Sequence, residues 1–131
     1  MRRVLGTLVL TLLLAVSGCG GSSSSSASDR CEPLPAAAVE HLGYALDGKQ
    51  LVNPVAVRSN DFEHVYFVAA NVDGSPALWA MNGLDGYGLI LSVNDHAYDV
   101  SHMGRGEGTD AHITESDDGA SEALSCVDAA E

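Results

Sequence analysis

The chain has 131 residues, of which 18 are acidic and six are basic, and its formal net charge is −12. Nucleic-acid phosphates and anionic lipid headgroups repel a polyanion of this density, so the composition argues against nucleic-acid binding. About 100 residues follow the N-terminal region, which is enough for one hydrophobic core and too few for two domains.

The first 19 residues have the layout of a bacterial secretory signal. Arg2 and Arg3 form a positive n-region, residues 4–16 are almost continuously apolar, and a small Ser-Gly pair leads to Cys19. The apolar run is too short to read comfortably as a transmembrane helix. We therefore expect residues 1–18 to be removed as a signal peptide.

The last four residues of this region, Val-Ser-Gly-Cys at 16–19, resemble the lipobox of bacterial lipoproteins. In that family the cysteine is thioether-linked to diacylglycerol and becomes the new N-terminus. The resemblance implies a lipidated Cys19, acyl chains such as palmitate, and a place at the extracytoplasmic face of the cell membrane. Two acyl chains suffice for stable anchoring. Residues 19–30 are rich in Gly and Ser, which predicts a flexible tether after the lipidated cysteine.

Two further cysteines, Cys31 and Cys126, lie near the two ends of the segment that is expected to fold. An even pair in an oxidising compartment predicts a disulfide. The alternative is that both cysteines are free, buried thiols, as is usual for proteins in a reducing compartment.

The first elements after the tether are a helix and a strand. Apolar residues at spacings of three and four, together with Pro33 and Pro35 near the start, predict a helix over residues 32–45. Residues 51–58 predict a strand, and Pro54 within it indicates an edge position or a bulge.

The clearest strand is predicted at residues 62–72. Over residues 65–70 the odd-numbered and even-numbered side chains are both apolar, so we expect a central strand covered on both faces. Two further strands of the meander are expected at 77–82 and 89–93, separated by the glycine-rich turn 83–88.

The C-terminal part is predicted to contain two helices and a loop. Asn94 or Asp95 is a candidate cap for a short helix over 96–101. Residues 103–119 are rich in glycine and acids, contain one strongly apolar residue, and are interpreted as a mobile loop.

A final helix is predicted at about 119–127, with Asp117-Asp118 as its cap, and it would carry Cys126 back to the first helix. The predicted fold is a single small α+β domain over residues 31–131. It contains an antiparallel meander of about four strands, with an N-terminal and a C-terminal helix joined by the disulfide.

The domain resembles a group of small secreted proteins and lipoproteins of high-GC Gram-positive bacteria that have no assigned activity. The segments that carry the resemblance are Cys31-Glu-Pro-Leu-Pro, Val65-Tyr-Phe-Val-Ala-Ala70, Leu78-Trp-Ala80, Ser92-Val-Asn94 with Ala97 and Ser101, and Cys126-Val127. These motifs are structural, so the resemblance implies a fold and a location without a reaction.

Histidines and aspartates gather in residues 95–112, where the candidate metal ligands are His96, Asp99, His102 and His112, with Asp95 and Asp110 nearby. Imidazole and carboxylate groups suit zinc and other transition metals. No H-E-x-x-H, cysteine-pair or calcium-loop motif is present, and histidine beside aspartate is common in so acidic a chain. The sequence therefore predicts no metal or cofactor, and this cluster is kept as an alternative.

Other candidate chemistry is weaker. Asp99, Ser101 and His102 are too close along one helix to align as a catalytic triad, and no G-x-S-x-G elbow is present. The glycines of 83–88 lie between two predicted strands with no Lys or Arg beside them, so they indicate a turn and not a phosphate loop. Trp79 and Tyr87 are aromatic residues of the meander, and we expect them in the core, with a ligand groove as the alternative.

The sequence thus predicts a non-catalytic, lipid-anchored binding or structural module. One alternative is a metal-dependent binding protein or enzyme that uses His96, Asp99, His102 and His112. The other is an inhibitor or immunity-type protein whose acidic face docks on a basic envelope protein.

Overall fold

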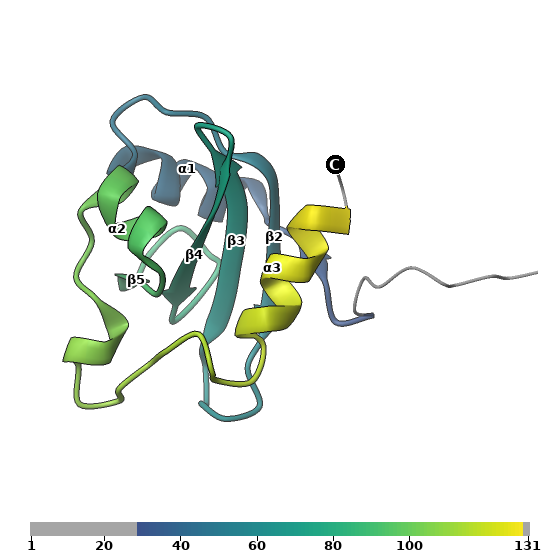
Figure 1. Cartoon of the computed structure of the whole chain (residues 1–131), viewed down its shortest axis with the longest axis vertical. Coiled ribbons are helices and arrows are strands. Elements are labelled where there is room, and N and C mark those ends of the chain that lie inside the picture. The colour runs from purple at the N-terminus through teal and green to yellow at the C-terminus, as the bar shows by residue number, and fades with distance from the viewer. Residues whose placement is uncertain (1–28, 130–131) are drawn as a thin grey trace, which may run out of the picture.

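The computed structural model describes residues 29–129 (Figure 1). The predicted signal peptide, Cys19 and most of the tether lie outside the described residues. No helix within 29–129 has the length and apolar character needed to cross a bilayer. The elements in chain order are β1 Glu32–Pro33, α1 Ala36–Ala45, β2 Val52–Arg58, β3 Tyr66–Val72, β4 Ser75–Met81, β5 Ile90–Ser92, α2 Asp95–Ser101, the 3₁₀ turn η1 Gly106–Gly108 and α3 Ala120–Ala129.

The strands form one antiparallel sheet in which each strand pairs with its neighbours in sequence, in the order β1-β2-β3-β4-β5. The predicted meander is confirmed, with five strands in place of about four. The additional strand, β1, lies inside the range 32–45 that the sequence predicts as helix. Glu32 and Leu34 each precede a proline, which disfavours the helical region for both. The N–H of Leu34 instead donates to the carbonyl of Pro54 at 3.2 Å.

Strand β2 contains the bulge that Pro54 predicts, because its register against β3 shifts between Val52 and Val55. Proline has no N–H to donate to the neighbouring strand, so a bulge at this position leaves no backbone N–H unpaired. On the other side of β2, β1 pairs only with Val55 and Ala56. Most of this edge of the sheet is therefore left without a strand partner among the described residues.

Strand β3 is the centre of the domain, as the sequence predicts. Phe67 and Ala69 pack toward α3 on one face, whereas Val68 and Ala70 pack toward α1 and α2 on the other face. All four side chains are fully buried. Two-sided burial of this kind explains why the strand is apolar at consecutive positions and not only at alternate ones.

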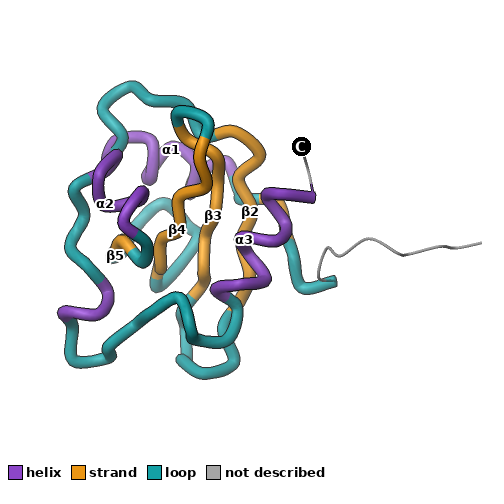
Figure 2. Tube along the Cα trace, in the orientation of Figure 1, coloured by secondary structure: helices purple, strands orange, loops and turns teal. Residues whose placement is uncertain are grey.

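Helices cover both faces of the sheet (Figure 2). Leu42 of α1 and Trp79 of β4 belong to the core on one face, and Ala123 and Val127 of α3 belong to the core on the other. Because α1 and α3 lie on opposite faces, the disulfide does not join these two helices, which corrects the sequence prediction. It joins α3 to the residue that precedes β1.

The two ends of the described chain are fastened together beside this disulfide. Cys31 and Cys126 are bonded, with their Cα atoms 6.3 Å apart and 95 positions between them in sequence. The guanidinium of Arg30 donates to both carboxylate oxygens of Asp118, at 3.0 and 2.7 Å. Asp118 also accepts the N–H of Asn60 at 2.7 Å. These bonds hold the pKa of Asp118 below its usual range, with the Arg30 hydrogen bond as the larger cause.

Helix α2 is capped by Asn94, one of the two predicted candidates. Its side-chain oxygen accepts the N–H of Ala97 at 2.9 Å and the N–H of Leu78 at 3.1 Å, and its amide donates to the carbonyl of Pro76 at 3.1 Å. One side chain therefore caps the helix and also ties its start to β4, which fixes α2 on the sheet.

Residues 103–119 lack long elements, as predicted, but they are built into the domain. Arg105 forms a parallel bridge with Ser92 of β5, and η1 follows directly. Ile113 is only 5% exposed and packs in the core on the α3 face. The single strongly apolar residue of this loop therefore anchors it to the sheet.

The start of α3 differs from the predicted capping. The carboxylate of Asp117 accepts the N–H of Thr114 at 2.7 Å, and the carboxylate of Asp118 binds Arg30 and Asn60. Glu122 accepts the N–H of Gly119 at 3.0 Å instead. Glu122, a residue of the helix itself, therefore accepts a backbone N–H at the start of α3. The two aspartates instead form hydrogen bonds with neighbouring segments.

Candidate functional site

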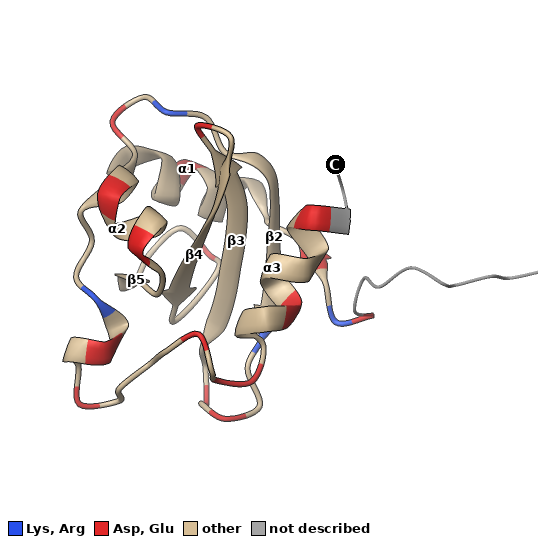
Figure 3. Cartoon of the chain, viewed as in Figure 1, with Lys and Arg blue, Asp and Glu red and all other residues tan. Residues whose placement is uncertain are grey.

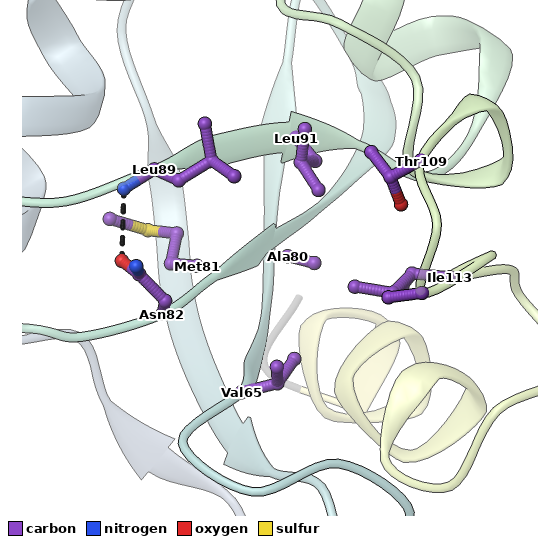
Figure 4. A pocket seen from close by; sticks show the side chains of 9 residues that line it. Val65, Ala80, Met81, Asn82, Leu89, Leu91, Thr109 and Ile113 are labelled. Carbon is purple, nitrogen blue, oxygen red and sulfur yellow. Dashed lines mark hydrogen bonds between the residues drawn. The ribbon is translucent and has the colours of Figure 1, made fainter.

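An apolar pocket of about 160 Å³ opens on the face of the sheet that α3 covers (Figure 4). It is lined by Val65, Ala80, Met81, Asn82, Leu89, Leu91, Thr109, Ala111 and Ile113. None of these side chains is titratable or nucleophilic at ordinary pH, apart from the weakly reactive hydroxyl of Thr109. The pocket can therefore bind an apolar group, and it carries no acid, base or metal ligand.

The pocket exists because a small residue stands where larger ones meet. Ala80 of β4 pairs directly with Leu91 of β5, and the side chains of Val65, Leu91 and Ile113 surround it (Figure 4). The methyl group of Ala80 does not fill the space between these larger side chains. Val65 comes from the segment before β3 and Ile113 from the loop after η1, so three separate parts of the chain enclose the site.

The loop wall of the pocket is held close by a glycine. A Cβ on Gly106 would lie 2.8 Å from the carbonyl oxygen of Ile113, which is closer than side chains tolerate. The same glycine accepts three hydrogen bonds at its carbonyl, from the Ile113 N–H at 3.0 Å, the Thr109 N–H at 3.2 Å and the Thr109 hydroxyl at 2.6 Å. The hydroxyl of Thr109 is therefore hydrogen-bonded within the loop, and the wall of the pocket is apolar.

The rim is formed by the last turn before β5. Leu89 is 55% exposed although its neighbours Ile90 and Leu91 are buried. Its N–H donates to the side-chain oxygen of Asn82 at 2.9 Å, the bond drawn in Figure 4. A Cβ on Gly88 would lie 2.1 Å from that same oxygen. The turn therefore requires glycine at 88 and presents an apolar leucine to the solvent at the mouth of the pocket.

Ser101, a candidate nucleophile, has a structural role. Its hydroxyl is buried, donates to the carbonyl of Ala97 at 2.6 Å and accepts the indole N–H of Trp79 at 3.0 Å. The hydroxyl of Ser92 lies 3.4 Å away. No histidine or carboxylate makes a hydrogen bond with Ser101 in these contacts, so the structure does not assemble the triad. Trp79 is fully buried, as predicted.

The candidate metal ligands are not brought together. Among residues 29–129 no three His, Cys, Asp or Glu side chains are placed to share a metal ion. The ring of His96 donates to the carbonyl of Val72 at 2.7 Å, and that of His112 donates to the carbonyl of Glu107 at 2.8 Å. His102 ends α2 in the left-handed conformation, and Asp99 and Asp110 are exposed.

Asp95 takes part in an ion pair instead of a metal site. Its carboxylate accepts a hydrogen bond from the guanidinium of Arg105 at 2.7 Å. This bond is the main reason that the pKa of Arg105 is raised above its ordinary value. The same guanidinium lies over the ring of Tyr98, 4.4 Å from its centre. The arrangement combines a carboxylate and an aromatic face around one cation.

The glycine-rich segment 83–88 is a turn, as predicted. Gly86 and Gly88 have positive φ angles of 93° and 109°, and Asp85 accepts the N–H of Tyr87 at 3.2 Å. Tyr87 differs from the prediction because it is 79% exposed and does not reach the core. The turn carries the ring outward, which is the reason that a residue of the meander becomes a surface residue.

Sequence reasoning did not find the apolar pocket. Its walls come from segments separated by up to 48 positions, from Val65 to Ile113, so no motif or periodicity marks it. The usable signal is the run Leu89-Ile90-Leu91 at the edge of the sheet. Three consecutive large apolar residues at an edge strand cannot all reach one core, and Leu89, the residue before β5, is exposed. No protein-family model matches this chain, and neither a curated protein nor a solved structure shows significant similarity to it.

Proposed function

We propose that this protein is a non-catalytic binding module, held by lipid on Cys19 at the extracytoplasmic face of the cell membrane, whose ligand group occupies the apolar pocket. The observation that carries the proposal is the pocket itself: an apolar space of about 160 Å³ with an exposed leucine at its mouth. A cavity of about 150 Å³ in another protein binds benzene or xenon. The expected ligand group is a short alkyl chain or one aromatic ring.

The disulfide fits the proposed location, because such bonds persist in oxidising compartments outside the cytoplasm. The formal charge of the full chain is −12, and loss of Arg2 and Arg3 with the signal peptide would make it −14, which fits a domain that stands away from anionic headgroups and does not bind nucleic acid. Under this proposal the lipid supplies the membrane attachment, and the folded domain supplies the binding surface.

The pocket is tested with a series of straight-chain alcohols from butanol to octanol. Each buried methylene is worth about 0.8 kcal/mol, so affinity should rise about fourfold per carbon until the pocket is full and then level off. Methyl NMR signals of Leu89, Leu91 and Ile113 report the binding. Shifts without dependence on chain length, or shifts spread over both faces of the sheet, contradict the proposal.

A matched pair of variants identifies the site. Ala111 lines the pocket from its exposed side, so Ala111→Leu should fill the space and weaken alcohol binding by about tenfold or more. Ala36 is also exposed, at the start of α1, and does not line the pocket. Ala36→Leu should bind as the unchanged protein does. Equal binding by both variants refutes the assignment.

The anchor is tested separately by the intact mass of protein extracted from membranes. Cys19 should carry a diacylglycerol and residues 1–18 should be absent, and Cys19→Ser should release the protein from the membrane. An unlipidated Cys19 in membrane-extracted protein refutes the anchor and leaves the binding site untouched.

A further inference from the structure

A second hollow, of about 220 Å³, lies between α1 and the turn 83–88 and shares no lining residue with the apolar pocket. It is lined by Ala37, Glu40, His41, Tyr44, Asp85, Gly86 and Tyr87, and we call it the tyrosine hollow. Tyr44 and Tyr87 are each 79% exposed, more than any other large apolar side chain in residues 29–129. Exposed tyrosines of this kind are enriched where proteins bind one another.

The two sides of the tyrosine hollow are fastened to each other. A Cβ on Gly86 would lie 3.3 Å from the carbonyl oxygen of Ala37, so the turn approaches the helix closely. The ring of His41 donates to the carbonyl of Gly88 at 3.0 Å, and Asp85 accepts the N–H of Tyr87 at 3.2 Å. The hollow is therefore formed before any ligand arrives, which lowers the entropy cost of binding.

The charge of the hollow is negative. Glu40 and Asp85 contribute carboxylates, and none of its lining residues is Lys or Arg. The hydroxyl of Tyr44 donates to the carboxylate of Glu40 at 3.0 Å, and this bond raises the pKa of Tyr44. Acidic residues also occur along the helices and loops around the sheet, as Figure 3 shows. A cation is thus attracted to this surface and then meets two aromatic rings.

Elsewhere in this chain, an arginine side chain already contacts both a tyrosine ring and a carboxylate. Arg105 lies over the ring of Tyr98 and pairs with Asp95. The lining of the tyrosine hollow contains the same kinds of group, two tyrosine rings and the carboxylates of Glu40 and Asp85. A guanidinium is planar, so it can stack on a ring and donate to a carboxylate at once, whereas an ammonium behaves as a point charge.

We propose that the tyrosine hollow binds an arginine side chain presented by a basic segment of a partner protein. This goes beyond the proposed function, since it uses other residues and another ligand chemistry. The open hollow and the formal charge of −12 favour a side chain on a protein surface over a free metabolite. Arginine is also among the residues most often found at the energetic centre of protein interfaces.

The probe is the capped peptide Gly-Gly-Arg-Gly-Gly, titrated into the purified, isotope-labelled protein and followed by amide NMR. Shifts should concentrate on α1 and the turn 83–88. The same peptide with citrulline in place of arginine keeps the shape without the charge and should give no shifts there. The lysine peptide and free arginine should each bind at least threefold more weakly. Equal binding by the citrulline peptide, or tighter binding by free arginine, overturns the proposal.

Substitutions locate the binding. Tyr87→Ala and Glu40→Gln should each weaken binding about two- to fivefold, the range expected for a cation–π contact or an ion pair at an exposed site. Tyr87→Phe keeps the ring and should retain affinity. Glu63 is exposed and lies outside the hollow, so Glu63→Gln is the control for net charge. A loss with Glu63→Gln as large as that with Glu40→Gln shows non-specific attraction and refutes the site. Unchanged Trp79 emission confirms that each variant is folded.

Discussion

The hydroxyl of Ser101 offers a sharp test of how the core is held. Trp79 is fully buried, so its indole N–H has no access to water and relies on the bond to Ser101 at 3.0 Å. The N–H of Met103 also points to this hydroxyl, at 3.4 Å. Ser101→Ala removes the acceptor for both donors while it keeps the backbone of α2.

The size of the effect follows from the burial of Trp79. A buried donor left without a partner costs about 1–3 kcal/mol. Alanine favours a helix slightly more than serine, which returns at most about 0.5 kcal/mol in the last turn of α2. We therefore expect a loss of about 2 kcal/mol in the free energy of unfolding. For a domain of this length that loss lowers Tm by about 8–15 °C.

Urea unfolding followed by far-UV circular dichroism measures this loss. Ser116 is exposed, so Ser116→Ala is the matched control and should change stability by less than about 0.5 kcal/mol. In a double-mutant cycle, Ser101→Ala and Trp79→Phe break the same bond, so their combined cost should fall short of the sum of the two. A loss below about 0.5 kcal/mol for Ser101→Ala, or full additivity in the cycle, refutes this account.

Three further predictions concern the fastening of the ends and the turns. Reduction of Cys31–Cys126, or its replacement by two serines, should lower the free energy of unfolding by up to about 4.7 kcal/mol in the chain-entropy model, and unfolding midpoints unchanged by reductant contradict it. The pKa of Asp118 is lowered from its ordinary value of 3.8, so its carboxylate stabilises the fold above that value and loses this contribution as the pH falls through the folded-state pKa. The Tm difference between Asp118→Asn and the unchanged protein should therefore be constant above about pH 5 and decrease as the pH falls through the folded-state pKa, and a difference that is no smaller in strong acid than at neutral pH argues against the pairing of Arg30 with Asp118. Gly88→Ala should lower Tm because its Cβ would meet the Asn82 side chain at 2.1 Å, whereas Gly43→Ala, in α1 with no atom within 4 Å of the new Cβ, should stabilise the helix by about 0.5–1 kcal/mol. Thermal unfolding of the two glycine variants in opposite directions confirms both, and a shift in the same direction contradicts one of them.

The sequence predicts the elements that depend on local patterns. Strand β3 was recognisable because consecutive apolar residues between Phe67 and Ala70 require cover on both faces, and α2 because Asn94 has the side chain for a cap. Strand β1 could not be predicted from the sequence, because two exposed residues show no hydrophobic periodicity. Only the pairing with β2 makes them a strand.

The pocket, the hollow and the buried hydrogen bonds depend on contacts between residues far apart in the sequence. No local sequence pattern indicates such contacts. Arg30 and Asp118 meet across 88 positions, and Trp79 and Ser101 across 22. The apolar pocket arises from the small size of Ala80 beside larger neighbours, which is visible only when the loop carrying Ile113 is in place. The tyrosine hollow requires Gly86 to bring its turn against α1.

The bond between Cys31 and Cys126 also decides how the domain answers a mechanical pull. A force applied between the two ends of the described chain passes through this crosslink, and the hydrogen-bonded ladders of the sheet carry little of it. Stretching the oxidised protein should therefore release almost no length. Reduction opens a loop of 95 positions, and the chain then gains roughly 320 Å of contour at about 3.4 Å per residue. A single covalent bond thus makes the domain inextensible between its two ends.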